Sequence, residues 1–146
     1  GLSMTLESFR IQHSTLIEHY QYIEAHLEGI YAAIAGKSLL DGLSDVESAN
    51  LYRILREIER VESQKNICVL TNDEYASLRQ IIARRNFWCH NCYYDMVFDC
   101  KKGGLKKSED IQKMNSDLRE AAVWREKLYT VQMGLFDKNR EILQSF

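Results

Sequence analysis

Residues 84–93 read RRNFWCHNCY and combine two arginines, a histidine and two cysteines with three aromatic rings. Three kinds of chemistry fit these residue types. Cysteine and histidine bind zinc, a cysteine beside a histidine can act as a nucleophile, and a histidine with an arginine can act on phosphate esters. The spacing of the residues along a helix separates these alternatives.

The metal alternative uses Cys89, His90 and Cys92, and the nucleophile alternative uses the first two. C-x-x-C is a genuine zinc element, but a structural zinc ion needs four ligands, and Cys89 falls on the predicted core stripe of its helix. Adjacent helical residues point about 100° apart, so Cys89 and His90 cannot form the hydrogen bond that a nucleophile needs. We therefore expect neither a metal ion nor another cofactor here.

The remaining alternative depends on Arg85, Asn86 and His90. Asn86 and His90 are four positions apart, so their side chains share one face of a helix and can meet. Arg85 points about 140° away from His90 on an ideal helix. Arg85 and His90 would reach a common ligand only if the helix is distorted, or if a second copy of the chain supplies one of them.

Residues 85–90, RNFWCH, match the pattern R-N-x3-H, and the distance from Arg84 to His90 fits the broader pattern R-x4-6-H. This motif resembles the signature of the HEPN superfamily of helical nucleotide-binding domains, and its R-N-x3-H form is similar to that of HepT-type toxins and abortive-infection proteins. HepT-type toxins carry a tyrosine, modified by their antitoxin, two positions after the histidine. Here that position is Cys92, and tyrosines follow at Tyr93 and Tyr94.

The resemblance implies a metal-independent endoribonuclease of a toxin or phage-defence system, which would cut RNA at the cleft of a homodimer. His90 would act as general acid or base on the 2′-hydroxyl, and Arg85 would stabilise the charge of the phosphorane. Asn86 would orient the phosphate or the imidazole. An antitoxin is a further partner that the resemblance suggests.

Two other interpretations stay open at this point. A HEPN-like bundle can bind nucleotides or RNA without cleaving them, because a fold does not determine a function. An unrelated helical bundle could serve protein interaction alone. In that case His90 would be buried and hydrogen-bonded to the backbone or to Asn86.

Basic residues gather around the motif although the whole chain has a net charge of −2. Residues 76–107 contain seven basic and two acidic side chains, a local charge of +5, and such a segment attracts anions such as RNA. The alternative is an ordinary solvated face with a lysine-rich loop. The residues predicted to bind substrate are Arg84, Lys101, Lys102, Lys106 and Lys107.

The elements that must position these residues are helical. The chain has 146 residues, 45% of them hydrophobic, with no proline and only seven glycines, which predicts a single all-α domain over residues 1–146. We expect Met4 to be the natural start. No apolar run reaches the ~18 residues of a membrane span and no signal peptide precedes the four cysteines, so we expect a cytoplasmic protein with reduced thiols.

Apolar periodicity predicts an antiparallel bundle of four main helices, two of them long. The expected helices cover residues 6–34, from a cap at Ser44 or Asp45 to about 63, from a cap within 71–73 to about 99, and from Ser108 almost to 146. Residues 37–44 are expected to form a turn, and residues 66–71 a connector. His13 falls on the apolar seam of the first helix, where we expect a satisfied core or interface histidine.

The third predicted helix is apolar on more than one side. Leu78, Ile82, Cys89, Met96 and Cys100 form the expected core stripe, and Ala83, Phe87, Tyr94 and Phe98 lie opposite. We expect a homodimer that buries the second side of this helix. The alternative is burial beneath the connector and the ends of the long helices.

Overall fold

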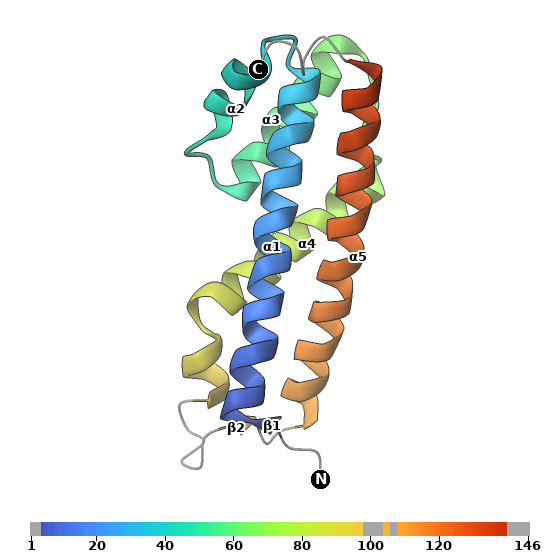
Figure 1. Ribbon diagram of the computed structural model, residues 1–146. Helices are drawn as coiled ribbons and strands as arrows, with labels where there is room; N and C mark the ends of the chain where they lie inside the picture. Colours follow the sequence, from blue (N-terminus) through green and yellow to red (C-terminus); the bar gives the residue numbers. More distant parts are fainter. Residues whose placement is uncertain (1–3, 98–103, 106–107, 140–146) are drawn as a thin grey trace.

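The computed structural model describes residues 4–97, 104–105 and 108–139 of the chain (Figure 1). Five α-helices are present in these ranges: α1 (Leu6–Ile34), α2 (Leu39–Val46), α3 (Leu51–Lys65), α4 (Asn72–His90) and α5 (Ser108–Lys138). A π-helical turn, η1 (Tyr93–Val97), follows α4. Two short strands, β1 (Met4–Thr5) and β2 (Gly104–Leu105), pair antiparallel just before α1 and α5. The all-α class is confirmed.

Helix α1 has the predicted bounds and forms the centre of the molecule. The Thr5 side chain caps it by accepting a hydrogen bond from the Ser8 backbone N–H at 3.1 Å. The seam of residues spaced three and four apart is buried as expected, with Leu16 and Leu27 fully inaccessible. None of the helices in the described ranges is long and apolar enough to cross a membrane.

Helix α2 occupies the segment that was predicted to be a turn. The Ser38 side chain caps it by accepting from the Asp41 backbone N–H at 3.2 Å, and Leu39 and Val46 are buried. The next helix, α3, is capped by Asn50, so the predicted cap at Ser44 or Asp45 is wrong. Two turns of helix are too short to give a clear period of 3.6 residues, and this explains why the sequence pattern resembled a turn.

The short helix α2 also changes the direction of the helices that follow. The chain rises in α1, descends through α2, rises in α3, descends in α4 and rises in α5 (Figure 1). The two long helices are therefore parallel: Glu18 meets Arg125, and His26, further along α1, meets Gln132, further along α5. The predicted antiparallel order holds where α2 packs on α1 and where α4 packs on α1 and α3. One unpredicted reversal is enough to invert the relation between the first and last helices.

Helix α4 begins as predicted and ends earlier than predicted. Thr71 and Glu74 form a capping box, since each side chain accepts a hydrogen bond from the other's backbone N–H. Regular helix stops at His90 and continues as η1 after Asn91, instead of running to about residue 99. Helix α5 begins at Ser108 as predicted, and its expected extension to residue 146 lies outside the described residues.

Candidate functional site

Trp88 determines which way the end of α4 faces. Its side chain is 1% exposed, and its indole N–H donates to the Asp117 carboxylate of α5 at 2.8 Å. Arg84 reaches α5 on one side of the indole, and Arg85 reaches α1 on the other. The buried face at this end of α4 is therefore centred on Trp88, although Leu78 marks the buried face near its beginning.

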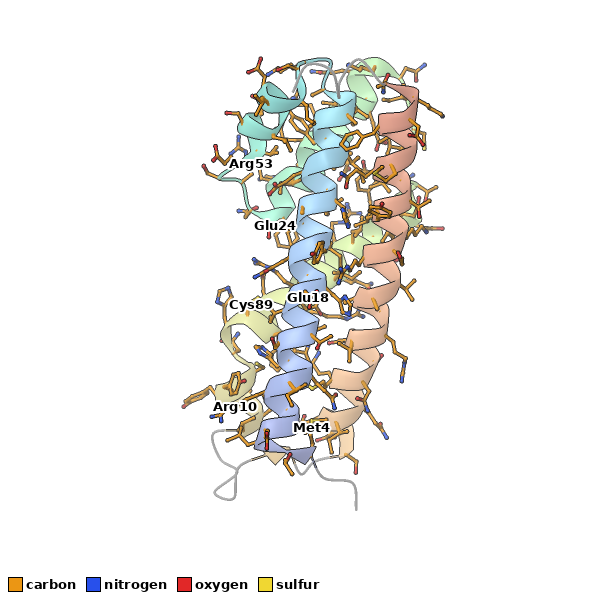
Figure 2. All side chains as sticks on the ribbon, in the orientation of Figure 1. Met4, Arg10, Glu18, Glu24, Arg53 and Cys89 are labelled. Carbon is orange, nitrogen blue, oxygen red and sulfur yellow. The ribbon has the colours of Figure 1, made fainter. Side chains whose placement is uncertain are left out.

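The two cysteines of the motif differ in exposure, and Cys89 does not lie in the core as predicted. Cys89 is exposed, and Figure 2 shows it at the edge of the bundle, where α4 emerges beside α1. Cys92 is buried, its Sγ lies 3.2 Å from the Trp88 carbonyl oxygen, and burial raises the pKa of its thiol to about 11. Because α4 crosses α1 obliquely, it presents different faces to the core at its two ends, which moves Cys89 off the core stripe.

Arg85 and Asn86 touch each other beside α1. The Arg85 Nη1 donates to the Asn86 Oδ1 at 3.3 Å, and its Nη2 lies 3.8 Å from a carboxylate oxygen of Glu24. Both side chains are partly exposed. The Glu24 contact is long for an ion pair, so the guanidinium can turn toward an incoming anion without losing a strong bond.

His90 ends α4 on the side away from Trp88, and its side chain is exposed. It has no hydrogen bond or ion pair with any other residue that the structure describes, Asn86 included. This contradicts the alternative in which His90 is buried and satisfied. Because α4 stays regular from Arg85 to His90, those side chains diverge within one chain, as an ideal helix requires.

Arg84 is held between α4 and α5. It forms a close ion pair with Glu120, which raises the pKa of the guanidinium, and its Nε lies 3.8 Å from Asp117. These contacts favour a structural role, and its assignment to substrate binding stays a prediction. The four lysines predicted to bind substrate, Lys101, Lys102, Lys106 and Lys107, lie outside the described residues.

His13 positions the end of α4, a role that its place in the α1 seam did not reveal. Its Nε2 donates to the Trp88 carbonyl oxygen at 2.7 Å, and its ring lies against Phe9 and Tyr93. The carbonyls of the last turn of a helix lack partners within the helix, so His13 satisfies one of them from a neighbouring helix. The prediction that His13 is hydrogen-bonded within the fold is confirmed, and its side chain is half-buried.

The second apolar side of α4 is covered in part by the chain itself. The Phe87 ring meets Trp88 edge to face at 5.0 Å between centroids, and the Lys113 ammonium lies 4.9 Å from the Phe87 centroid. Ala83 and Tyr94 are exposed, and Phe98 lies outside the described residues. The long helix α5 thus supplies some of the burial that was predicted to need a partner.

Comparison with known protein families, curated proteins and solved structures finds no match to this chain. Within the described ranges, no three His, Cys, Asp or Glu side chains lie together as potential metal ligands. The site must therefore be judged on its own geometry.

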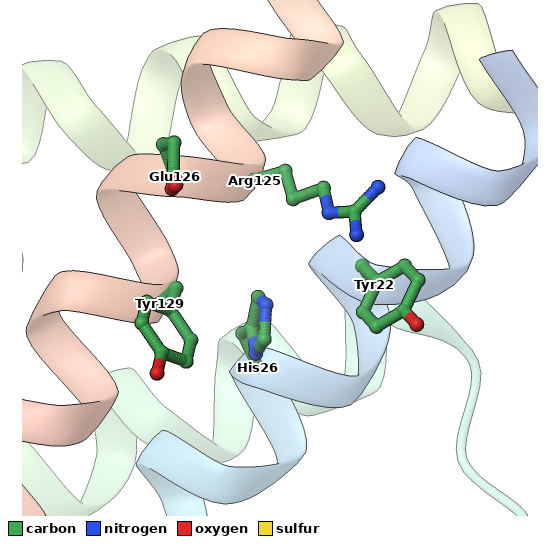
Figure 3. A pocket seen from close by; sticks show the side chains of 5 residues that line it. All are labelled: Tyr22, His26, Arg125, Glu126 and Tyr129. Carbon is green, nitrogen blue, oxygen red and sulfur yellow. The ribbon is translucent and has the colours of Figure 1, made fainter. Parts of the chain in front are cut away.

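A second concave site, which the sequence did not predict, lies in the groove between α1 and α5 (Figure 3). It has a volume of about 220 Å³, and its lining residues are Tyr22, His26, Arg125, Glu126 and Tyr129. His19 and His26 of α1 both meet α5, at Arg125 and Gln132 respectively. Burial first, and then Arg125, lower the pKa of His19.

Proposed function

We propose that this protein is a metal-independent endoribonuclease of the HEPN type, acting in a toxin or phage-defence setting. The observation that carries the proposal is the exposed His90 at the end of α4, one turn beyond the Arg85–Asn86 pair. Trp88 and Arg84 anchor the same two turns to α5, which leaves the three motif side chains near solvent.

The proposed reaction needs a proton acceptor, a proton donor and a stabiliser of negative charge. His90 takes the proton from the RNA 2′-hydroxyl, whose oxygen attacks the adjacent phosphorus. Arg85 donates hydrogen bonds to the phosphorane oxygens, while Asn86 holds the phosphate or the guanidinium in place. A protonated His90, from either copy in the dimer, gives a proton to the leaving 5′-oxygen, so the products carry a 2′,3′-cyclic phosphate and a 5′-hydroxyl.

The proposal includes a homodimer through α4. Since Arg85 and His90 diverge in one chain, a two-fold pair would let Arg85 of one copy and His90 of the other face the same phosphate. Ala83 and Tyr94, on the second apolar side predicted for this helix, are both exposed in the single chain. Light scattering after gel filtration should give about twice the chain mass of 17.1 kDa.

Cleavage of a fluorescently labelled RNA tests the function directly. His90→Ala and Arg85→Ala should each slow cleavage by about 10²–10⁴-fold, and EDTA should have no effect. Arg79→Ala is the matched control, because Arg79 lies on the same helix in an exposed ion pair with Glu59. Wild-type protein that leaves RNA intact, or cleavage equally impaired by Arg79→Ala, would refute the proposal.

A second candidate function, binding of RNA or a nucleotide without cleavage, is favoured by the contact between Arg85 and Glu24. A guanidinium shared with a carboxylate is less available to a transition state but can still hold a phosphate. This candidate predicts that RNA binds, that Arg85→Ala weakens the binding, and that no cyclic phosphate forms.

Co-purification from a bacterial host would reveal an antitoxin partner.

A further inference from the structure

The groove between α1 and α5 has the shape and chemistry of a binding site for one flat ring. Figure 3 shows His26 between Tyr22 and Tyr129, with Arg125 reaching over Tyr22 from α5. The His26 centroid lies 6.0 Å from that of Tyr22 and 5.5 Å from that of Tyr129. Both tyrosines remain more than two-fifths exposed, so their rings are available to a ligand.

The imidazole at the centre of this groove is held in one orientation. The Nδ1 of His26 donates to the Gln132 Oε1 at 2.7 Å. Gln132 reaches this place because Gly29 has no side chain: a Cβ on Gly29 would lie 2.7 Å from the Gln132 amide carbon. With Nδ1 donating, the neutral ring has a lone pair on Nε2, which has no partner among the described residues.

The charges around the groove select the kind of ring. Arg125 is occupied, since its guanidinium stacks 3.8 Å above the Tyr22 centroid and its Nη1 meets His19 and Glu18. Glu126 lines the groove and has no counter-ion among the residues that the structure describes. Glu126 in the groove, and Glu18 beside Arg125 just outside it, offset this one occupied guanidinium. This balance disfavours a phosphate and favours a neutral ligand that donates hydrogen bonds.

We propose that this groove binds an unpaired nucleobase that carries an amino group, stacked against Tyr129 with its edge toward His26, whose ring is inclined by 60° to that of Tyr129. The amino group donates to Nε2 of His26 and to the Glu126 carboxylate. Proteins bind single-stranded RNA by stacking its bases on aromatic side chains and reading their edges with hydrogen bonds. The inference rests on the proposed function in naming RNA as the source of the base.

The groove and the motif lie on different sides of α1. Tyr22 and Glu24 are two positions apart, so they point about 160° away from each other on this helix, toward the groove and toward Arg85 respectively. A bound base would lie roughly one helix diameter, ~10 Å, from the Arg85 side. An RNA strand that crosses α1 would then have one nucleotide held by the groove while another is cut.

Cytidine and uridine provide a sharp test, since they differ in the amino or carbonyl group on the same ring carbon. Nuclear magnetic resonance of the histidine ring C–H groups in the full chain would follow titration with cytidine, uridine or inorganic phosphate. We expect cytidine to shift the His26 signal saturably, with at least tenfold weaker binding of uridine and no effect of phosphate. Tyr129→Leu should weaken cytidine binding about tenfold.

Tyr52→Leu is the matched control, because Tyr52 is as exposed as Tyr22 but lies on α3. Equal binding of cytidine and uridine, a response to phosphate alone, or an equal effect of Tyr52→Leu would overturn the inference. An RNA cleavage assay on the same samples separates the two proposals. If the protein cleaves RNA but does not bind cytidine, only the proposal of a nucleobase site is refuted. If it binds cytidine but does not cleave RNA, only the proposal of a nuclease is refuted.

Discussion

At the scale of single residues, the burial of Trp88 determines which neighbouring side chains pack inside the fold and which face solvent. It is buried between α1 and α5, so Arg84 and Cys92 become packing residues and Cys89 and His90 face outward. Its two polar groups are both satisfied, the indole N–H by Asp117 and the carbonyl by His13. The burial of this one indole ring therefore decides which side chains of the motif can reach a ligand.

Thiol labelling should distinguish the cysteines of the motif. In Cys100→Ser protein at pH 7.5, iodoacetamide should modify Cys68 and Cys89 quickly, because both are exposed. Cys92 should react only after unfolding, since it is buried and its thiol pKa is raised to about 11. Peptide mass spectrometry would read the sites, and rapid native labelling of Cys92 would show that the orientation of α4 is wrong.

Asp117 should be essential to the stability of the same region. Asp117→Ala leaves the buried Trp88 indole N–H without its acceptor, whereas Arg84 keeps its ion pair with Glu120, and the expected loss is about 1–3 kcal/mol. Asp117→Asn keeps an acceptor for the indole and should cost less. Urea unfolding measures both, and equal stability of the alanine variant and the wild type would contradict this network.

At the scale of helices, α2 has more influence than its eight residues suggest. It packs across the end of α1 and reverses the chain once more than the sequence pattern indicated. That reversal makes α1 and α5 parallel and creates the groove that holds His26 and Tyr129. A close approach between Gly42 and Ala32 makes the packing of α2 possible.

Two glycine substitutions test this packing. A Cβ on Gly42 would lie 2.9 Å from the Ala32 Cα, so Gly42→Ala must push backbone apart and should cost about 1–3 kcal/mol. Gly134→Ala is the control, because nothing lies within 4 Å of its Cβ position in α5 and it should stabilise by about 0.5–1 kcal/mol. If Gly42→Ala and Gly134→Ala both stabilise the protein, α2 does not pack against Ala32 as described.

At the scale of the whole molecule, charge is distributed unevenly around α1. Glu24, Glu28 and Glu47 lie near one another, and burial followed by these two neighbours raises the pKa of Glu28. Arg85 is the cation that meets this cluster in the described chain. An RNA phosphate that reaches Arg85 must therefore compete with the Glu24 carboxylate, in a region where Glu28 adds negative charge, which favours weak, salt-sensitive binding.

The pH dependence of stability should reveal the cluster. Glu28 holds a proton more tightly in the folded chain, so its carboxylate lowers the free energy of unfolding at pH 7. Glu28→Gln should raise that free energy by roughly 0.5 kcal/mol, and the gain should vanish toward pH 4. Glu74→Gln should do the opposite at pH 7, because the hydrogen bond from Lys127 lowers the pKa of Glu74. If Glu28→Gln and Glu74→Gln change the free energy of unfolding in the same direction at pH 7, these two pKa directions are contradicted.

The helical class, the bounds of α1, the start of α5 and the capping box of α4 followed from the sequence because each depends on neighbouring residues. Local rules also placed Arg85, Asn86 and His90 on one helix, although that helix was expected to continue to about residue 99. Helix α2 and the end of α4 were missed, since a short helix has little periodicity and the break after His90 is held by His13, 75 positions away.

The sequence by itself therefore determined which segments are helical and which residue types share a face, because periodicity and capping act within a few residues. The tertiary structure alone decided that Trp88 faces inward, that Cys89 and His90 face outward, and that Tyr22, His26 and Tyr129 share a groove. These outcomes depend on how α4 crosses α1 and on the parallel order of α1 and α5. Such contacts join residues far apart in the chain, and no local pattern encodes them.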